Sequence, residues 1–223
     1  GEVPNPSDAV PDMHDFTGQI KYTWQGAYPV KTHLYVENLP PRMHTRAAVH
    51  IIRNPLDVVD SSVAYLRTDT LSERADLINT YGTHGGIEPW RTMLGYGSWQ
   101  GNVASWIDTK HDFPVLFFRY EEMLADPHDH VRRLAEFFST EVSDERVDEI
   151  VQLTSFSSLR ALEEKEVAES SHGVFSDEQR EEKPDFRFMR SGKAGSYVEN
   201  LSEDEISRLT EYFRPTMEVH GYL

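Results

Sequence analysis

An apolar run followed at once by a proline-led helical pattern constrains the fold of this chain more than any other feature. Residues 47–52 (Ala-Ala-Val-His-Ile-Ile) have the length and β-branched content of a buried strand, which ends at Arg53. Pro55 stands where a helix would begin, because its φ is already helical and its missing N–H is not needed there. The apolar residues of 56–66 favour a helix packed on a sheet. The segment therefore predicts a strand, a tight turn and a helix.

The same junction is suited to binding an anion. A helix N-terminus presents free backbone N–H groups and the positive end of the helix dipole. The Arg53 guanidinium can hold a phosphate through two hydrogen bonds, and Ser61, about two turns into the helix, adds a hydroxyl. These residues predict a phosphate site. Taken alone, they fit an ordinary strand–helix junction with a surface arginine equally well.

The rest of the chain predicts helices that alternate with strands. Strands are expected at 28–34, where the strand runs into a loop, and at 115–118, and helices are expected from Gly97, at 127–138, at 144–153 after a Ser143 cap, and from the Ser202 capping box. Residues 68–96 contain several glycines and are predicted to form a long loop with some helix. The alternation indicates an α/β fold with a central parallel sheet flanked by helices. Ligands bind such sheets beyond the carboxyl ends of the strands, where His33 and Arg53 both fall.

Length and charge limit the classes of function. A chain of 223 residues is predicted to form a single domain over 1–223, irregular over residues 1–25. The net charge of −16 argues against a nucleic-acid partner or an acidic membrane surface. An anionic ligand would need a local basic pocket, and acidic runs such as Glu163-Glu164 indicate solvated faces.

Composition also excludes several kinds of chemistry. The absence of cysteine excludes disulfides and thiolate chemistry, and the ten histidines form no HExxH pair, so no metal site is predicted. No apolar run reaches membrane-spanning length and no signal peptide is visible. We therefore expect a cytoplasmic protein without a membrane partner.

Separated segments of the chain resemble, in order, the motifs of the cytosolic sulfotransferase family. These enzymes move a sulfuryl group from 3′-phosphoadenosine 5′-phosphosulfate (PAPS) to a hydroxyl or amine. The first two segments are Lys31-Thr32-His33, similar to Lys-x-His, and Arg53…Ser61, similar to the family's 3′-phosphate signature. The third is Thr154-Ser155-Phe156-Ser157-Ser158-Leu159, similar to Thr-Ser-Phe-x-x-Met. The fourth is Phe188-Met189-Arg190-Ser191-Gly192-Lys193-Ala194-Gly195, similar to Phe-x-Arg-Lys-Gly-x-x-Gly. Tyr120-Glu121-Glu122-Met123 and Gly97-Ser98-Trp99…Trp106 also match family segments. The resemblance implies a sulfotransferase fold of the P-loop-kinase-like type.

The resemblance implies a catalytic role for His33 and Lys31. Sulfuryl transfer, like phosphoryl transfer, needs the attacking and leaving oxygens in line, and the acceptor hydroxyl must lose its proton. A neutral imidazole suits that step, so His33 would be the general base, and Lys31 would stabilise charge near the transferring sulfuryl group or the leaving phosphate. Residues i and i+2 of an extended segment share a face, which is consistent with a joint role. A structural histidine and a solvated lysine are the alternatives.

The resemblance also implies a site for the nucleotide without a metal. The 3′-phosphate would be shared by Arg53, Ser61 and the Arg190-Ser191-Gly192 turn, where glycine lets the backbone approach the anion. The adenine would lie at the Thr154-Ser155-Phe156 segment, stacked on Phe156 with Thr154 and Tyr120 as polar contacts. A core role for Phe156 and a plain glycine loop at 190–192 are the alternatives.

Three family features are not matched. Nothing in residues 1–30 resembles the Pro-Lys-x-Gly-Thr-Thr-Trp-like loop that cradles the 5′-phosphosulfate. We expect the N-terminal strand and this loop to be missing from the sequence, and a chain without them to be a poor catalyst. Arg190-Ser191-Gly192 has one cation fewer than the family's Arg-Lys-Gly. The family's dimer signature, Lys-x-x-x-Thr-Val-x-x-x-Glu, is not reproduced, so a homodimer through an unknown interface is left open.

The leading hypothesis is a PAPS-dependent sulfotransferase acting on a hydroxyl of a small-molecule acceptor, such as a natural-product phenol. The alternative is a catalytically silent nucleotide-binding module on the same scaffold, which the missing loop favours. A nucleoside or shikimate-type kinase of related fold would need a Walker-type loop, and no Gly-x-x-x-x-Gly-Lys-Ser/Thr is present.

Overall fold

The computed structural model describes residues 10, 29–39, 45–66, 70–88, 95–107, 110–169, 175 and 187–223. The chain divides into two compact units. The first, here called the sheet unit, comprises Leu34–Val147 and Lys193–Leu223. The second, here called the α8 unit, comprises Gly1–His33 and Asp148–Gly192. Apart from Val10, the segment 1–25 lies outside the described residues.

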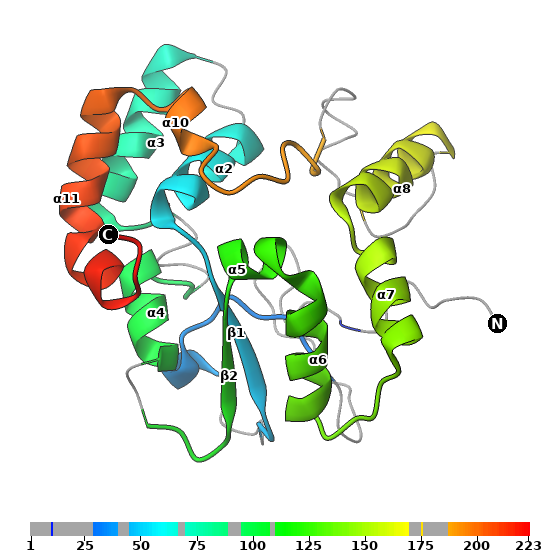
Figure 1. Cartoon of the computed structure of the whole chain (residues 1–223). Coiled ribbons are helices and arrows are strands. Elements are labelled where there is room, and N and C mark those ends of the chain that lie inside the picture. Colours follow the sequence, from blue (N-terminus) through cyan, green and yellow to red (C-terminus); the bar gives the residue numbers. More distant parts are fainter. Residues whose placement is uncertain are drawn as a thin grey trace. The chain divides into compact units, whose positions relative to one another are not determined.

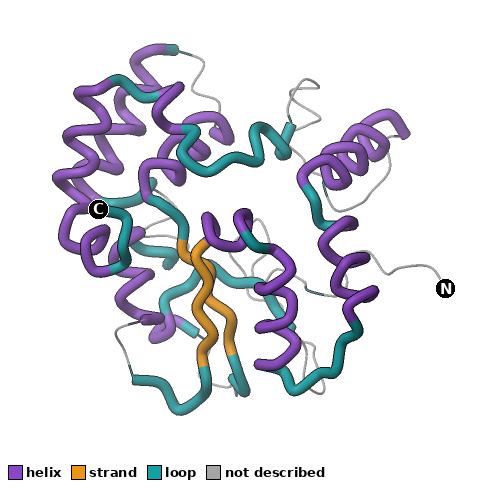
Figure 2. Tube along the Cα trace, viewed as in Figure 1, coloured by secondary structure: helices purple, strands orange, loops and turns teal. Residues whose placement is uncertain are grey.

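Two parallel strands form the sheet of the sheet unit (Figure 2). They are β1 (Ala48–Ile52) and β2 (Val115–Arg119), with His50 opposite Phe117. Parallel neighbours cannot be joined by a tight hairpin, and here the crossover passes through α2, α3 and α4. The predicted strands at 47–52 and 115–118 and the predicted α/β class with a parallel sheet are confirmed.

Helices cover both faces of this strand pair. On one face, the His50 ring stacks on Trp106 of α4 (Trp99–Ile107), with ring centroids 5.8 Å apart. On the other, Phe118 meets His130 of α6 (Pro127–Phe137) edge to face at 4.8 Å. Because successive strand residues point to opposite faces, Phe117 lies on the face of His50 and Phe118 lies on the face of His130.

The main hydrophobic core of the sheet unit lies among three helices (Figure 1). These are α2 (Pro55–Leu66), α3 (Leu71–His84) and α11 (Glu203–Val219). Its buried members are Leu56, Val59, Leu77, Ile78, Tyr81, Leu201, Leu209, Phe213 and Met217. The predicted helix from Pro55 and the Ser202 capping box are both confirmed: Ser202 Oγ accepts the Glu205 N–H at 3.3 Å, and the Glu205 carboxylate accepts the Ser202 N–H at 2.8 Å.

The segment 68–96, predicted to be a long loop with some helix, contains more regular structure than expected, because the 14-residue helix α3 lies there; residues 68–69 and 89–94 lie outside the described residues. A reciprocal capping box between Thr70 and Glu73 begins the helix, and Gly85 ends it with a φ of 69°. Gly82, which suggested a loop, lies inside the helix. Packing of an apolar face against the core outweighs the weak helix propensity of glycine.

The remaining elements are shorter or belong to the α8 unit. The sheet unit also contains the 3₁₀ helix η1 (Val36–Asn38), α5 (Tyr120–Ala125) and α10 (Tyr197–Asn200). The first four residues of α7 (Asp144–Leu153) belong to the sheet unit and the rest to the α8 unit, which also contains α8 (Phe156–Glu169). The Ser143 cap on α7 is confirmed by its hydrogen bond from the Arg146 N–H at 3.3 Å. The described part of the predicted strand 28–34 has only a bridge residue, Lys31, instead of a regular strand. Within the described ranges, no helix has the length and apolar character needed to cross a membrane.

A matched pair of leucines tests the three-helix core. Leu209 of α11 is 1% exposed, whereas Leu71, at the start of α3, is 86% exposed. Leu209→Ala should lower the free energy of unfolding by about 2–5 kcal/mol, because it removes apolar contacts and leaves a cavity. Leu71→Ala should change it by less than about 0.5 kcal/mol. Urea unfolding followed by circular dichroism measures both values, and equal losses would contradict this core.

Candidate functional site

Arg53 lies directly after β1, at the carboxyl end of the strand, as predicted. Its guanidinium carbon lies 4.5 Å from the centroid of the Tyr120 ring, which follows β2 directly. The two predicted site residues therefore stack at the ends of neighbouring strands. The Trp99 indole donates to the Arg53 carbonyl at 3.1 Å and fixes the backbone there. The buried Arg53 Nε has no hydrogen-bond partner among the described residues, and the Asp57 carboxylate lies 4.0 Å from Arg53 Nη2.

The first turn of α2 is capped by the chain itself. The Asn54 side chain accepts the Leu56 N–H at 2.9 Å, and Pro55 has no N–H to offer. The Asn54 N–H donates to the Glu121 carboxylate at 2.8 Å, which joins this turn to α5. The helix N-terminus thus offers fewer free donors than the sequence predicted. An anion here would depend mainly on Arg53.

Asp57 is the buried anchor of this region. Its carboxylate is 0% exposed and accepts the Gly195 N–H at 2.8 Å and the Tyr197 N–H at 3.2 Å. The Ser196 hydroxyl, at 3.4 Å from Asp57, also donates to Asp60 at 2.9 Å. The segment 195–197 is thereby tied to the first turns of α2. Sequence reasoning gave Asp57 no role, although a carboxylate four residues after Arg53, between the apolar Leu56 and Val58, was a signal.

Ser61 is half-buried, and its neighbour Ser62 is the serine that the core uses. The Ser62 hydroxyl donates to the Val58 carbonyl and pairs with the Tyr81 hydroxyl, both at 2.8 Å. Burial raises the pKa of Tyr81 to about 12, so this phenol stays protonated. The Ser61 hydroxyl has no hydrogen bond to any residue within the described ranges. Its predicted role toward a phosphate stays a prediction.

The Lys31-Thr32-His33 segment presents its two candidate catalytic side chains on the surface. Lys31 and His33 are exposed, in keeping with an extended segment in which i and i+2 share a face, and Leu34 is 4% exposed. Two residues of α4 bind the Leu34 carbonyl: the Trp106 indole donates at 2.9 Å and the Asn102 amide at 3.4 Å. The backbone immediately after His33 is therefore held firmly.

A half-buried histidine orients one of these donors. His50 Nε2 lies 3.2 Å from Asn102 Oδ1, and burial is the main cause that lowers the pKa of His50 below its usual value. A neutral His50 can donate to Asn102 Oδ1, which leaves the Asn102 amide group to donate to the Leu34 carbonyl. Sequence reasoning had placed His50 only in a strand. Trp106 itself is 6% exposed and belongs to the buried core.

In the α8 unit, the hydroxyls of Thr154 and Ser155 form hydrogen bonds at the end of α7 and the start of α8. Thr154 Oγ1 donates to the Ile150 carbonyl at 2.8 Å at the end of α7. Ser155 Oγ accepts the Ser158 N–H at 3.2 Å at the start of α8. Their contacts with adenine, and the stacking of adenine on Phe156, stay predictions.

The structure brings Phe156 and Gly192 together. Gly192 has a φ of +62°, and a Cβ there would lie 2.1 Å from Phe156 Cδ2. The prediction that Glu163-Glu164 forms a solvated face is wrong for Glu163, which is 0% exposed. Its carboxylate accepts backbone N–H groups just before Arg190, which is itself exposed, while Ser191 is half-buried.

The predicted site residues are thus divided between the units. Arg53, Ser61 and Tyr120 belong to the sheet unit, where Arg53 and Tyr120 are in contact. The α8 unit contains Lys31, His33, Thr154, Ser155, Phe156, Arg190, Ser191 and Gly192. That the two groups serve one ligand stays a prediction at this point.

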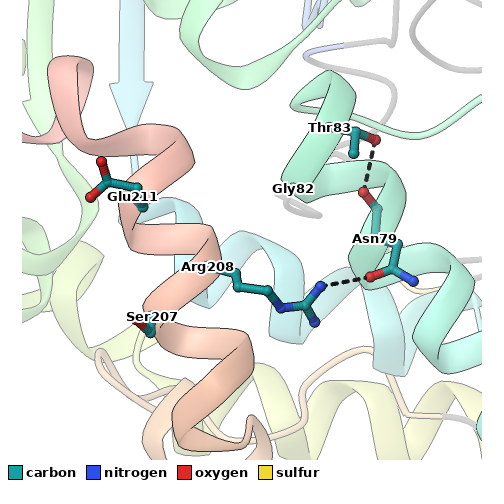
Figure 3. Close-up of a pocket in the computed structure, with 6 residues that line it drawn as sticks. All are labelled: Asn79, Gly82, Thr83, Ser207, Arg208 and Glu211. Atoms are coloured by element: carbon teal, nitrogen blue, oxygen red, sulfur yellow. Dashed lines mark hydrogen bonds between the residues drawn. The ribbon is translucent and has the colours of Figure 1, made fainter.

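Neither a metal cluster nor a surface hollow provides an alternative site among the described residues. No group of three or more histidine, aspartate or glutamate side chains in the described ranges could hold a metal ion. A surface hollow shown in Figure 3 is lined by Asn79, Gly82, Thr83, Ser207, Arg208 and Glu211 of α3 and α11. None of these is a predicted site residue. Arg208 donates to the Asn79 side chain at 2.9 Å and Thr83 to its carbonyl at 2.8 Å, so the polar groups are used within the protein.

Asp57→Asn tests the anchor. The amide can accept at one atom only, so at least one buried backbone N–H of the 195–197 segment loses its acceptor. We expect the free energy of unfolding to fall by about 1–3 kcal/mol in urea titrations. Asp76→Asn, an exposed position on α3, is the control and should change stability by less than about 0.5 kcal/mol. Equal values for the two variants would show that Asp57 anchors nothing.

Comparison with known proteins places this geometry in a family. The profile described as the sulfotransferase domain matches residues 21–221, which include every predicted site residue. Dog sulfotransferase 1B1 (Canis lupus familiaris) is 30% identical over 164 residues, which are 71% of this chain and 53% of that protein. Rat sulfotransferase 1A1 (Rattus norvegicus) is 26% identical over 198 residues, 84% of this chain and 62% of that protein. The chain spans about half to three fifths of the length of these relatives.

Solved structures share the fold. Mouse sulfotransferase SULT7A1, complexed with PAP, aligns with a TM-score of 0.65 at 24% identity, covering 85% of this chain and 65% of that one. Retinol dehydratase, in complex with androsterone and the inactive cofactor PAP, aligns with a TM-score of 0.63 at 22% identity, covering 85% of this chain and 53% of that one. Since the domain profile covers nearly the whole sequence, the chain belongs to the sulfotransferase family.

Proposed function

We propose that this protein transfers a sulfuryl group from PAPS to the hydroxyl of a small-molecule acceptor, such as a phenol, without a metal. The observation that carries the proposal is Arg53, which stacks on Tyr120 at the end of β1 and whose buried Nε has no acceptor among the described residues. Family membership supports the reaction type. The named structural neighbours are complexes with PAP, which supports a 3′-phosphoadenosine nucleotide as ligand.

Arg53 has the chemistry to bind the 3′-phosphate. A planar guanidinium forms two parallel hydrogen bonds with a phosphate, and one stacked on an aromatic ring loses little further freedom on binding. Asp57 lies 4.0 Å from Arg53 Nη2, but its oxygens are occupied by backbone N–H groups. The cation is therefore available for an anionic ligand. Ser61 and the Arg190-Ser191-Gly192 turn would complete the phosphate site.

His33 would act as the general base toward the acceptor. The O–H bond of the acceptor breaks as its oxygen attacks sulfur, the proton goes to the imidazole, and the bond from sulfur to the 5′-phosphate oxygen breaks. Lys31 would stabilise the negative charge that develops on the leaving phosphate. The exposure of both side chains is consistent with access by an acceptor. The catalytically silent module is the outcome in which the nucleotide binds and no transfer follows.

His33→Ala separates catalysis from binding. Sulfation of a panel of phenols with radiolabelled PAPS should fall by about 10²–10⁴-fold, because the proton acceptor is removed. The affinity for 3′-phosphoadenosine 5′-phosphate (PAP), measured by calorimetry, should stay the same. His84→Ala, another exposed histidine, is the control and should leave both quantities unchanged. A parallel loss of transfer and PAP affinity in His33→Ala would indicate a structural role for His33.

Arg53→Ala tests the phosphate site. Loss of a charged hydrogen-bonding partner should weaken PAP binding by about 1.5–3 kcal/mol, roughly ten- to a hundredfold in dissociation constant. The matched control is Arg133→Ala, because Arg133 of α6 also lies over an aromatic ring, 4.9 Å from the centroid of Phe118. Its removal should leave PAP affinity unaltered. Unchanged affinity in Arg53→Ala would exclude this arginine from the site.

A further inference from the structure

Three side chains on one face of α8 contact the segment 187–192, which contains the Arg190-Ser191-Gly192 turn. They are Phe156, Arg160 and Glu163. Their spacing of i, i+4 and i+7 places them on a single helical face. The described part of this segment, 187–192, forms no helix or strand of its own, so its backbone geometry depends on these contacts.

Glu163 makes the most specific contact. Its carboxylate is 0% exposed and accepts two consecutive backbone N–H groups, from Phe188 at 2.6 Å and from Met189 at 3.0 Å. A buried carboxylate is costly unless its oxygens are hydrogen-bonded, and bonds from N–H groups to a charged acceptor are stronger than neutral ones. Glu163 therefore fixes the two peptide groups immediately before Arg190.

Arg160 and Phe156 contact the same segment, 187–192, on either side of Arg190. Arg160 donates from Nη1 to the Met189 carbonyl, so the Met189 residue is bound at both its N–H and its C=O. Two residues beyond Arg190, the Phe156 ring packs against Gly192, whose φ of +62° suits glycine. The turn that carries Arg190 is thus held by α8 from both of its ends.

We propose that Glu163 and Arg160 are positioning residues for the 3′-phosphate, acting through the Arg190-Ser191-Gly192 turn. This rests on the proposed function, in which that turn binds the 3′-phosphate of the nucleotide. A guanidinium forms both of its phosphate bonds only when its plane is aligned, so a small backbone shift at Met189 costs affinity. The cost falls on the 3′-phosphate alone and spares the adenosine and the 5′-phosphate.

A pair of nucleotides that differ only in the 3′-phosphate tests this. Dissociation constants of PAP and of adenosine 5′-monophosphate are measured by calorimetry for each variant. Glu163→Gln keeps the side-chain shape but leaves one buried N–H without an acceptor. The PAP dissociation constant should rise about tenfold or more, and that of adenosine 5′-monophosphate should change by less than about twofold. An equal rise for both nucleotides would overturn the proposal.

Glu166→Gln is the matched control. Glu166 lies on the same helix, is 6% exposed and accepts a backbone N–H at 2.8 Å from Phe175, which is outside the Arg190-Ser191-Gly192 turn. Its substitution should leave the ratio of the two dissociation constants as in the wild type. A shift of that ratio equal to the one in Glu163→Gln would assign the effect to α8 as a whole and refute the specific role.

Two further variants keep the test decisive if Glu163→Gln unfolds, which circular dichroism would reveal. Arg160→Ala, at a residue that is only half-buried, should raise the PAP dissociation constant about threefold without affecting adenosine 5′-monophosphate. In an Arg190→Ala background, Arg160→Ala should have no further effect on PAP, because the group being positioned is gone. Additive effects would contradict positioning. A wild-type protein that fails to bind PAP would instead contradict the proposed function.

Discussion

The carboxylate of Asp57 is the interaction on which the geometry around Arg53 depends. A fully buried charge persists only when hydrogen bonds replace its hydration, and Asp57 obtains them from the backbone of residues 195–197. Residues 195–197 are thereby bound to α2, the helix that begins at Pro55, two residues after Arg53. The same carboxylate lies 4.0 Å from the Arg53 guanidinium. The Asp57 carboxylate thus both positions residues 195–197 and contributes to the electrostatic potential at Arg53.

The α8 unit uses the same physical device. Glu163 is also fully buried and also spends both oxygens on backbone N–H groups, those of Phe188 and Met189. In both places an acidic side chain on a regular helix substitutes for secondary structure in a segment that has little of its own. A helix holds its side chains to well-defined rotamers, so it can define loop geometry more closely than loop residues could among themselves.

Sequence reasoning succeeded where local chemistry decides the structure. Pro55 after a β-branched run fixed the strand–helix junction, and the Ser202 capping box located the start of α11, because both signals act within a few residues. It underestimated α3, where glycines suggested a long loop with only some helix and packing on α2 and α11 stabilises a helix of 14 residues. It also failed at Glu163, since nothing in Glu163-Glu164 reveals that backbone N–H groups 25 and 26 residues away donate to the Glu163 carboxylate, while Glu164 stays exposed. Burial of a charge is set by tertiary contacts that a single sequence does not display.

An acidic chain can still bind a polyanion if its nearby carboxylates are already satisfied. The net charge is −16, and two buried carboxylates, Asp57 and Asp60, lie in the helix that starts beside Arg53. Asp57 is hydrogen-bonded to backbone N–H groups and Asp60 to the Ser196 hydroxyl, so these charges are partly compensated by dipoles before any ligand arrives. The Arg53 guanidinium stacks on an aromatic ring instead of forming a close ion pair, and its charge remains available. Local compensation of this kind would let the proposed site attract a phosphate in spite of the chain's net negative charge.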